Sequence, residues 1–417
     1  MVFRLEIFYK LFQFTHLSND NMEVFSRPTL FTRVFALSIR HANSANLQRK
    51  HKIVIVGGGS GGCSMASRLC NHFGEGEVAV IEPRSTHYYQ PLWTLVGAGI
   101  KTVAESARPL AKVLTPKAKL YSDEITHIEP KESYVVLSNG DKVAGAEEAL
   151  KNDPRVCSNY STDYVEKTYK AYQDFKGGNA VFTLPAGPIK CAGAPQKVMY
   201  LFEDYLKRSG KNISATIHYF TATNKMFSVD KYSNVLSDIC KERNINCNLL
   251  YNLIEYDFLH ITPPMCCPEI LTKTPNLTNP KACDYVDVNT KTLRHNYYDN
   301  IFALGDCAAL PTSKTAAAVS AQAATVEKNI CDLINGGKGN VSEYDGYTSC
   351  PLVTGYNRGI IAEFDYTAQP LETFPFDQGK ERYIFYFIKA HILPPLYWDG
   401  LLKGLWSGPK TIRDLFN

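Results

Sequence analysis

Cysteine is the residue type whose placement in this chain most clearly suggests chemistry. The sequence holds twelve cysteines among 417 residues, and Cys191 follows Lys190 at the expected start of a helix. A helix N-terminus stabilises a thiolate, and a nearby lysine adds a weaker effect of the same sign. The spacing contains no CxxC or CxxxxC pair of the disulfide-reductase kind. Any redox partner of Cys191 must therefore come from a distant segment.

A glycine-rich turn supplies a second group of residues that could bind a ligand. The β-branched run 51–56 predicts a buried parallel strand and leads into Gly-Gly-Gly-Ser-Gly-Gly at 57–62. The helix expected over 63–73 would direct its N-terminal amides at a pyrophosphate. A second strand, 78–81, ends at Glu82, whose carboxylate could accept the ribose hydroxyls of an adenosine. The glycines of the GxGxxG pattern are Gly57, Gly59 and Gly62, and they predict a dinucleotide site.

That pattern does not separate FAD from NAD, but a later segment does. Residues 298–306 form a short apolar run that ends in Gly305-Asp306, followed by a helix of small residues expected over 315–324. In flavoproteins with two dinucleotide-binding domains, such an aspartate contacts the ribityl chain of FAD. The N-terminus of the next helix stabilises negative charge on reduced flavin. This segment therefore favours FAD over NAD as the dinucleotide at the glycine turn. The alternative is that residues 298–324 are an ordinary strand-to-helix turn.

The second half lacks the corresponding nucleotide site. Residues 179–184 and 214–220 are expected to form the first two strands of another Rossmann-like unit, with a helix over 195–209 between them. The turn 185–194 contains two prolines and no GxGxxG, so the phosphates of NADH would find no glycine cradle there. The segment that would bind the nucleotide instead carries Cys191, at the expected start of a helix.

Length and composition limit the function classes. A chain of 417 residues exceeds what one hydrophobic core usually supports, so we expect two or three domains. The composition is that of a globular protein, with 45% hydrophobic and 21% charged residues. A net charge of +4 without a basic stripe argues against nucleic acid as a partner. No CxxC…CxxC or HExxH spacing occurs, so no metal site is expected.

The first fifty residues differ from the rest. Residues 24–50 contain arginines and serines and no acidic residue, which is typical of a mitochondrial transit peptide. A disordered basic tail is the alternative, and Met22 is a possible true start. No apolar run reaches the roughly 18 residues that a bilayer span requires.

The C-terminal segment 383–406 is apolar and aromatic, with Lys389 and other cations interspersed. Pro394 and Pro395 are expected to break it into two short helices. An amphipathic helix pair of this kind can lie in a membrane interface and admit a lipid-soluble quinone. A dimer contact or a core-packing helix pair is the alternative.

Four longer runs carry a resemblance to a known family. They are residues 87–93, 183–197, 305–318 and 345–357. Together they resemble the mitochondrial type of sulfide:quinone oxidoreductase, over roughly residues 51–417. The resemblance implies an α/β fold with two interleaved Rossmann-like domains and a C-terminal membrane-contact region.

The same resemblance implies domain boundaries. Residues 1–50 would be a transit peptide, and the rest would be an FAD-binding domain in two parts (51–150 and 291–335), a second Rossmann-like domain (151–290) and a C-terminal domain (336–417). The protein would then be a peripheral, monotopic enzyme of the mitochondrial inner membrane.

The resemblance also implies the chemistry. Cys191 and Cys350 would be bridged beside FAD, and hydrosulfide would attack one sulfur to leave a persulfide and a thiolate. Electrons would pass through FAD to ubiquinone, and the sulfane sulfur would go to sulfite or glutathione. The residues implied to hold FAD are Gly57, Gly59, Ser60, Gly61, Gly62, Glu82, Gln90, Ile125, Asp306, Lys314, Thr315, Ala316 and Ala317.

The other cysteines are expected to be buried thiols. Cys307 is assigned to the core. Cys266 and Cys267 are the next candidates for a redox pair, but adjacent cysteines rarely bridge because their geometry is strained.

The chain is shorter than the family pattern in two places. An apolar strand with an Ala-Thr-Gly-like turn is missing after residue 143, and a polar hairpin is missing near 255–256. Losing a central strand leaves neighbouring backbone groups unpaired.

The sequence leaves two alternative functions open. One is a type II NADH:quinone oxidoreductase, against which the absence of a second GxGxxG argues. The other is an inactive, FAD-deficient product that acts only through binding.

Overall fold

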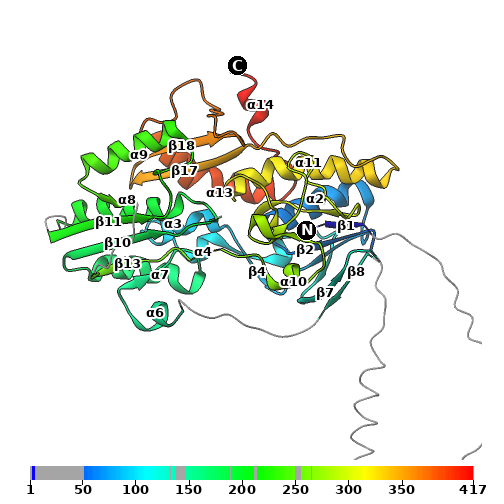
Figure 1. Cartoon of the computed structure of the whole chain (residues 1–417), viewed down its shortest axis with the longest axis horizontal. Helices are drawn as coiled ribbons and strands as arrows, with labels where there is room; N and C mark the ends of the chain where they lie inside the picture. Colours follow the sequence, from blue (N-terminus) through cyan, green and yellow to red (C-terminus); the bar gives the residue numbers. More distant parts are fainter. Residues whose placement is uncertain are drawn as a thin grey trace, which may run out of the picture.

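Two α/β units lie side by side, with a C-terminal hairpin and helical tail packed across them (Figure 1). The computed structural model describes residues 2–4, 51–131, 133–137, 147–187, 189–210, 214–248, 255–263 and 265–416. The predicted α/β architecture is confirmed.

The first unit is built on a five-stranded sheet with the order β16-β1-β2-β3-β6. Strands β2 (Ile53–Val56), β3 (Val78–Ile81) and β6 (Lys119–Tyr121) pair in parallel. Helices α2 (Ser60–Phe73) and α11 (Ala316–Ile334) pack against each other on this unit. The strand expected over 298–306 is reduced to β16 (Ile301–Phe302) followed by a 3₁₀ turn, η4 (Gly305–Cys307).

An N-terminal strand completes this sheet. β1 (Val2–Arg4) runs antiparallel between β2 and β16 and pairs with both. β1 therefore supplies backbone hydrogen-bond partners to both β2 and β16. The remainder of the expected transit peptide, residues 5–50, lies outside the described residues. So do residues 138–146, which contain the first predicted gap, and residues 249–254, which precede the second predicted gap near 255–256.

The second unit is a parallel sheet with the order β12-β11-β10-β13-β9. The predicted strands appear as β10 (Gly178–Leu184) and β11 (Ala215–Thr221), and the predicted helix as α8 (Ala194–Ser209). The other members are β9 (Val156–Cys157), β12 (Asn246–Asn248), β13 (Phe258–His260), α7 (Thr162–Asp174) and α9 (Asp230–Glu242). Aromatic rings fill the core between sheet and α8, with Phe202 and Phe258 stacked at 4.7 Å.

The C-terminal part joins the two units. Hairpin strands β17 (Thr348–Gly355) and β18 (Arg358–Phe364) are antiparallel, and β17 contacts both α8 and α11. The tail is one continuous helical run of α12 (Tyr383–Phe387), η5 (Ile388–Ile392), α13 (Leu393–Pro395) and η6 (Leu396–Leu401). The predicted break at Pro394 and Pro395 is wrong. η5 and η6 are π-helical, and this wider winding on both sides accommodates the prolines' missing N–H donors.

The remaining elements are short. They are β4 (Thr86–Tyr88), β5 (Ala107–Pro109), β7 (Ile125–Glu129), β8 (Tyr134–Leu137), β14 (Thr278–Asn279), β15 (Tyr285–Val286), η1 (Gln90–Leu92), α3 (Trp93–Val96), α4 (Val103–Ser106), α5 (Leu110–Val113), α6 (Glu147–Asn152), α10 (Glu269–Thr272), η3 (Pro280–Ala282) and α14 (Lys410–Arg413). None of the helices in the described part of the chain combines the length and apolarity that a bilayer span needs.

Candidate functional site

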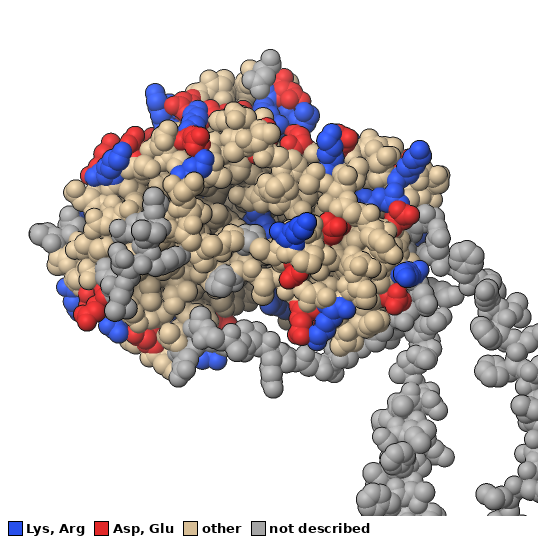
Figure 2. Space-filling view, in the orientation of Figure 1, with Lys and Arg blue, Asp and Glu red and all other residues tan. Residues whose placement is uncertain are grey.

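A cavity of about 600 Å³ lies where the two units and the tail meet. Its lining comes from the glycine turn before α2, the N-terminus of α11, the loop that carries Cys191, strand β17 and the tail. Figure 2 shows the protein from the same side as Figure 1, with a hollow near the middle that is bordered mostly by uncharged side chains. A volume of this size is typical of a cofactor site.

The glycine turn has the geometry of a dinucleotide-binding loop. Gly57 adopts a left-handed φ of +95°, and a Cβ added to Gly62 would lie 1.8 Å from the Gly57 carbonyl oxygen. Helix α2 begins at Ser60, three residues before the predicted start. Glu82 closes the turn, because its carboxylate accepts hydrogen bonds from the Gly58 amide (2.8 Å) and the Arg84 amide (3.0 Å).

These residues fit a bound FAD. A Cβ on Gly59 would meet no atom within 4 Å, so the turn leaves room for a ligand to approach the backbone. The N-terminus of α11 borders the same cavity and is capped by Thr315, whose hydroxyl accepts from the Ala318 amide at 3.1 Å. Two helix N-termini on one cavity favour negative charge on a ligand.

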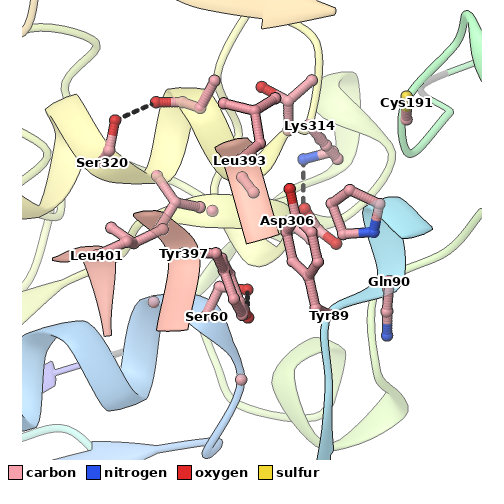
Figure 3. A pocket seen from close by; sticks show the side chains of 18 of the residues that line it. Ser60, Tyr89, Gln90, Cys191, Asp306, Lys314, Ser320, Leu393, Tyr397 and Leu401 are labelled. Atoms are coloured by element: carbon pink, nitrogen blue, oxygen red, sulfur yellow. Dashed lines mark hydrogen bonds between the residues drawn. The ribbon is translucent and has the colours of Figure 1, made fainter. Parts of the chain in front are cut away.

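The segment around Asp306 ties the two units together. The Asp306 carboxylate pairs with Lys190 at 3.0 Å, and the buried Lys314 ammonium donates to the Asp306 carbonyl at 2.7 Å (Figure 3). The Lys314 carbonyl in turn accepts from the Cys191 amide at 3.1 Å. Lys190, predicted to assist the Cys191 thiolate, is therefore engaged with Asp306.

Twelve of the thirteen expected FAD residues line the cavity: Gly57, Gly59, Ser60, Gly61, Gly62, Glu82, Gln90, Asp306, Lys314, Thr315, Ala316 and Ala317. Ile125 belongs to β7 and is not among the described residues of the lining. Its side chain is buried with Ile128 and Val286 in a separate apolar cluster of the first unit.

The two cysteines implied by the resemblance lie in contact. The sulfur atoms of Cys191 and Cys350 are 3.7 Å apart, although 159 positions separate the residues in the chain. Cys191 lies in the loop before α8 with a left-handed φ of 49°, and Cys350 is buried in β17. Gly193 permits the approach, since a Cβ there would lie 2.9 Å from the Cys350 sulfur.

Two buried lysines flank the sulfur atoms. Lys197 in α8 donates to the Cys191 sulfur at 3.3 Å. The hydrogen bond from Cys350 holds the pKa of Cys191 well below its usual value despite burial, with Lys197 and Lys389 adding to the effect. Lys389 was expected on the tail surface but is 2% exposed, and its ammonium donates to the Pro91 carbonyl at 2.5 Å. Burial and the charge of Lys197 lower the pKa of Lys389 to about 7.

Replacing Lys197 with methionine is expected to raise the pKa of Cys191 toward the ordinary thiol value. The substitution keeps the side-chain length but removes a cation 3.3 Å from the sulfur, and a nearby positive charge favours a thiolate. The pH dependence of Cys191 alkylation by iodoacetamide in the reduced protein measures this pKa. Lys190→Met is the control, since Lys190 pairs with Asp306. If the pH midpoint of Cys191 alkylation is the same in Lys197→Met as in the unchanged protein, Lys197 does not stabilise the Cys191 thiolate.

The tail reaches the glycine turn directly, a contact that sequence reasoning missed. The Tyr397 and Ser60 hydroxyls share a hydrogen bond of 2.7 Å (Figure 3). The His87 ring bonds the Tyr397 hydroxyl at 2.6 Å and the Gly58 carbonyl at 2.9 Å. His87 belonged to a run with family resemblance and Tyr397 to the apolar tail, but no spacing indicated that they would meet.

Comparisons with known proteins agree with this geometry. Residues 51–156 match the family described as pyridine nucleotide-disulphide oxidoreductase. The chain is 43% identical to the mitochondrial sulfide:quinone oxidoreductase of Mus musculus, over 90% of this chain and 92% of the mouse protein. It is 40% identical to the protein of the same name from Dictyostelium discoideum, over 88% and 89% of the two chains.

A solved structure shares the fold. The sulfide:quinone oxidoreductase of Aquifex aeolicus superposes with a TM-score of 0.70 at 18% identity, over 84% of this chain and 92% of that one. The similarity to the mouse and Dictyostelium proteins extends over nearly the whole chain and includes the segments that carry the glycine turn and both cysteines. The chain therefore belongs to the FAD-dependent mitochondrial sulfide:quinone oxidoreductase family.

Proposed function

We propose that this protein oxidises hydrogen sulfide at the Cys191–Cys350 pair and delivers the electrons to a quinone that enters from a membrane surface. The observation that carries the proposal is the contact of two thiols at 3.7 Å, beside a buried lysine, in a cavity that also contains the dinucleotide turn. FAD, when bound, supplies a two-electron carrier between thiol and quinone.

The sulfur step needs only the two cysteines and their lysines. Hydrosulfide attacks one sulfur of the oxidised pair, the S–S bond breaks, and the products are a persulfide on one cysteine and a thiolate on the other. Lys197 stabilises negative charge on Cys191 from 3.3 Å. Lys389, with its pKa lowered to about 7 by burial, can hold or release a proton near neutral pH. The sulfane sulfur then leaves with a small nucleophile such as sulfite or glutathione.

Sulfide, and not NADH, is expected to bleach the flavin absorbance of the purified protein under anaerobic conditions. The position where a second nucleotide would bind carries Pro185 and Cys191 in place of a glycine cradle, so NADH gains no phosphate contacts. Absorbance spectra after addition of each donor distinguish the two cases. Rapid bleaching by NADH would favour a type II NADH:quinone oxidoreductase instead.

The tail provides a surface suited to a membrane. Together with the residues that follow it, to 416, it carries seven of the ten exposed large apolar side chains in the described residues: Tyr383, Ile384, Ile392, Leu405, Ile412, Leu415 and Phe416. Two of these exposed residues, Ile392 and Ile412, also line the cavity, which supports an opening of the cavity toward this surface. Such a surface binds a bilayer through buried apolar area and would admit a quinone. We place the protein on the mitochondrial inner membrane.

Replacing Leu405 and Leu415 with glutamate is expected to weaken binding to liposomes by at least about tenfold. Burying one leucine side chain contributes about 1.5–3 kcal/mol, and both residues are 78% exposed. Point substitutions are preferable to removing the tail, because Trp398 and Leu402 are buried in the core. Flotation with liposomes is the measurement, and Tyr297→Glu with Val341→Glu is the control. Equal flotation of the Leu405/Leu415 variant and the unchanged protein would exclude this docking surface.

A further inference from the structure

The tail and the glycine turn share one cavity. The tail lines it at positions between Ile388 and Leu401, and the turn lines it from Gly57 to Gly62. Figure 3 shows Tyr397 and Leu401 of the tail beside Ser60 at the start of α2. A dinucleotide held by the glycine turn would therefore lie against the tail, so the position of the tail bears on how the cofactor enters and leaves.

The contact between tail and turn is a chain of three hydrogen bonds whose directions can be assigned. A carbonyl only accepts, so Nδ1 of His87 carries the proton in the 2.9 Å bond to Gly58. Burial lowers the pKa of His87, so at neutral pH the ring is neutral and Nε2 accepts from the Tyr397 hydroxyl at 2.6 Å. The Tyr397 oxygen then accepts from the Ser60 hydroxyl at 2.7 Å.

This chain of hydrogen bonds is buried. Tyr397 is 4% exposed and His87 is 5% exposed, so water does not replace a bond that is lost there, and a buried group left without its partner is costly. The tail is therefore held on the glycine turn by contacts that break only when this part of the structure opens.

Further hydrogen bonds hold the residues that follow Tyr397 on the first unit. The Ser67 hydroxyl donates to the Leu402 carbonyl at 2.7 Å, and the Arg68 guanidinium donates to the Trp406 carbonyl at 2.9 Å. Both donors belong to α2, the helix that begins at the glycine turn. Ser67 and Leu402 are not among the described residues that line the cavity, so their bond fastens the tail without facing the dinucleotide site.

We infer that residues 388–406 form a strap that closes the FAD site, and that Tyr397 is the residue that holds the strap on the glycine turn. FAD then leaves in two steps, because the strap must open before the dinucleotide can separate from the turn. Local opening of this kind sets the rate of ligand release in many lidded sites. The inference concerns retention of the cofactor, and it holds whichever donor reduces the flavin.

Tyr397→Phe is the first test, in full-length, FAD-loaded protein. The substitution keeps the ring but removes the hydroxyl that joins His87 and Ser60, and FAD release is expected to be at least about fivefold faster. Excess apo-glucose oxidase traps the released FAD, and its regained activity reports the rate. Tyr386→Phe is the control, since Tyr386 lies in α12 and is not among the described residues that line the cavity.

Ser67→Ala separates the strap from a local effect on the turn. It removes the bond to the Leu402 carbonyl outside the cavity lining, and release of FAD is expected to be at least about twofold faster. Ser64→Ala is the matched control in the same helix, since the buried Ser64 hydroxyl has no hydrogen-bond partner among the described residues.

All rates are compared at a temperature at which circular dichroism shows every variant folded. Faster release in both Tyr397→Phe and Ser67→Ala, with the two controls unchanged, is the expected result. Release that is faster in only one of the two variants, or in neither, would overturn the inference. Because release is measured without sulfide or quinone, this outcome is independent of whether the Cys191–Cys350 pair oxidises sulfide.

Discussion

Replacing either Cys191 or Cys350 with serine is expected to lower sulfide-dependent quinone reduction by about a thousandfold or more, the scale seen when a covalent nucleophile is removed. A hydroxyl cannot form the S–S bond that sulfide must break. The two sulfur atoms are in contact at 3.7 Å, so each substitution disables the pair as a unit. The measurement is steady-state reduction of a water-soluble quinone analogue with sulfide as donor.

Both variants should retain FAD, because neither cysteine belongs to the glycine turn. Serine is close to cysteine in volume, so the unfolding temperature should change little. Cys331→Ser is the matched control, since Cys331 lies in α11 and is not among the described residues that line the cavity. Near-normal turnover in either the Cys191 or the Cys350 variant would show that the sulfur chemistry occurs elsewhere.

Gly62→Ala is expected to deplete the purified protein of FAD. A Cβ at this position would lie 1.8 Å from the Gly57 carbonyl oxygen, so the turn must open for the side chain to fit. Overpacking of this kind costs about 1–3 kcal/mol or more, which corresponds to at least about a fivefold loss in FAD affinity when the cost falls on the bound conformation. Flavin absorbance per protein measures the outcome.

Gly61→Ala supplies the control for this change. The nearest atom to a Cβ on Gly61 belongs to the Leu304 side chain at 3.5 Å, an ordinary van der Waals contact. The Gly61 variant should therefore keep more of its flavin than the Gly62 variant. Full flavin content in Gly62→Ala would mean that the turn does not hold the dinucleotide as described.

Features encoded in short stretches of sequence were predicted well. The glycine turn, Glu82 at the end of β3 and the strand–helix–strand of the second unit all follow from local residue pattern, which sets strand and helix directly. Boundaries differed mainly where helix ends depend on tertiary contacts. α11 extends ten residues beyond its predicted end at 324, to Ile334.

Features that depend on contacts between distant segments were not predictable from the residues alone. The spacing of twelve cysteines could not identify the partner of Cys191, which family resemblance supplied and β17 brings into contact. Lys389 has the pattern of a surface cation, yet it is buried and lines the cavity. Strand β1 could not be predicted from its own residues. It is only three residues long, and it forms by pairing with β2 and β16, which lie far away in the sequence.

The most direct test of the Cys191–Cys350 assignment is a single anaerobic turnover with one equivalent of sulfide and no quinone. The reaction is quenched with an alkylating agent at successive times, and peptides are analysed by mass spectrometry while flavin absorbance is recorded. We expect one added sulfur on Cys191 or Cys350, formed no later than the flavin bleaches, and no added sulfur on Cys331. Complete bleaching by sulfide while both cysteines remain free of added sulfur would contradict the proposed mechanism.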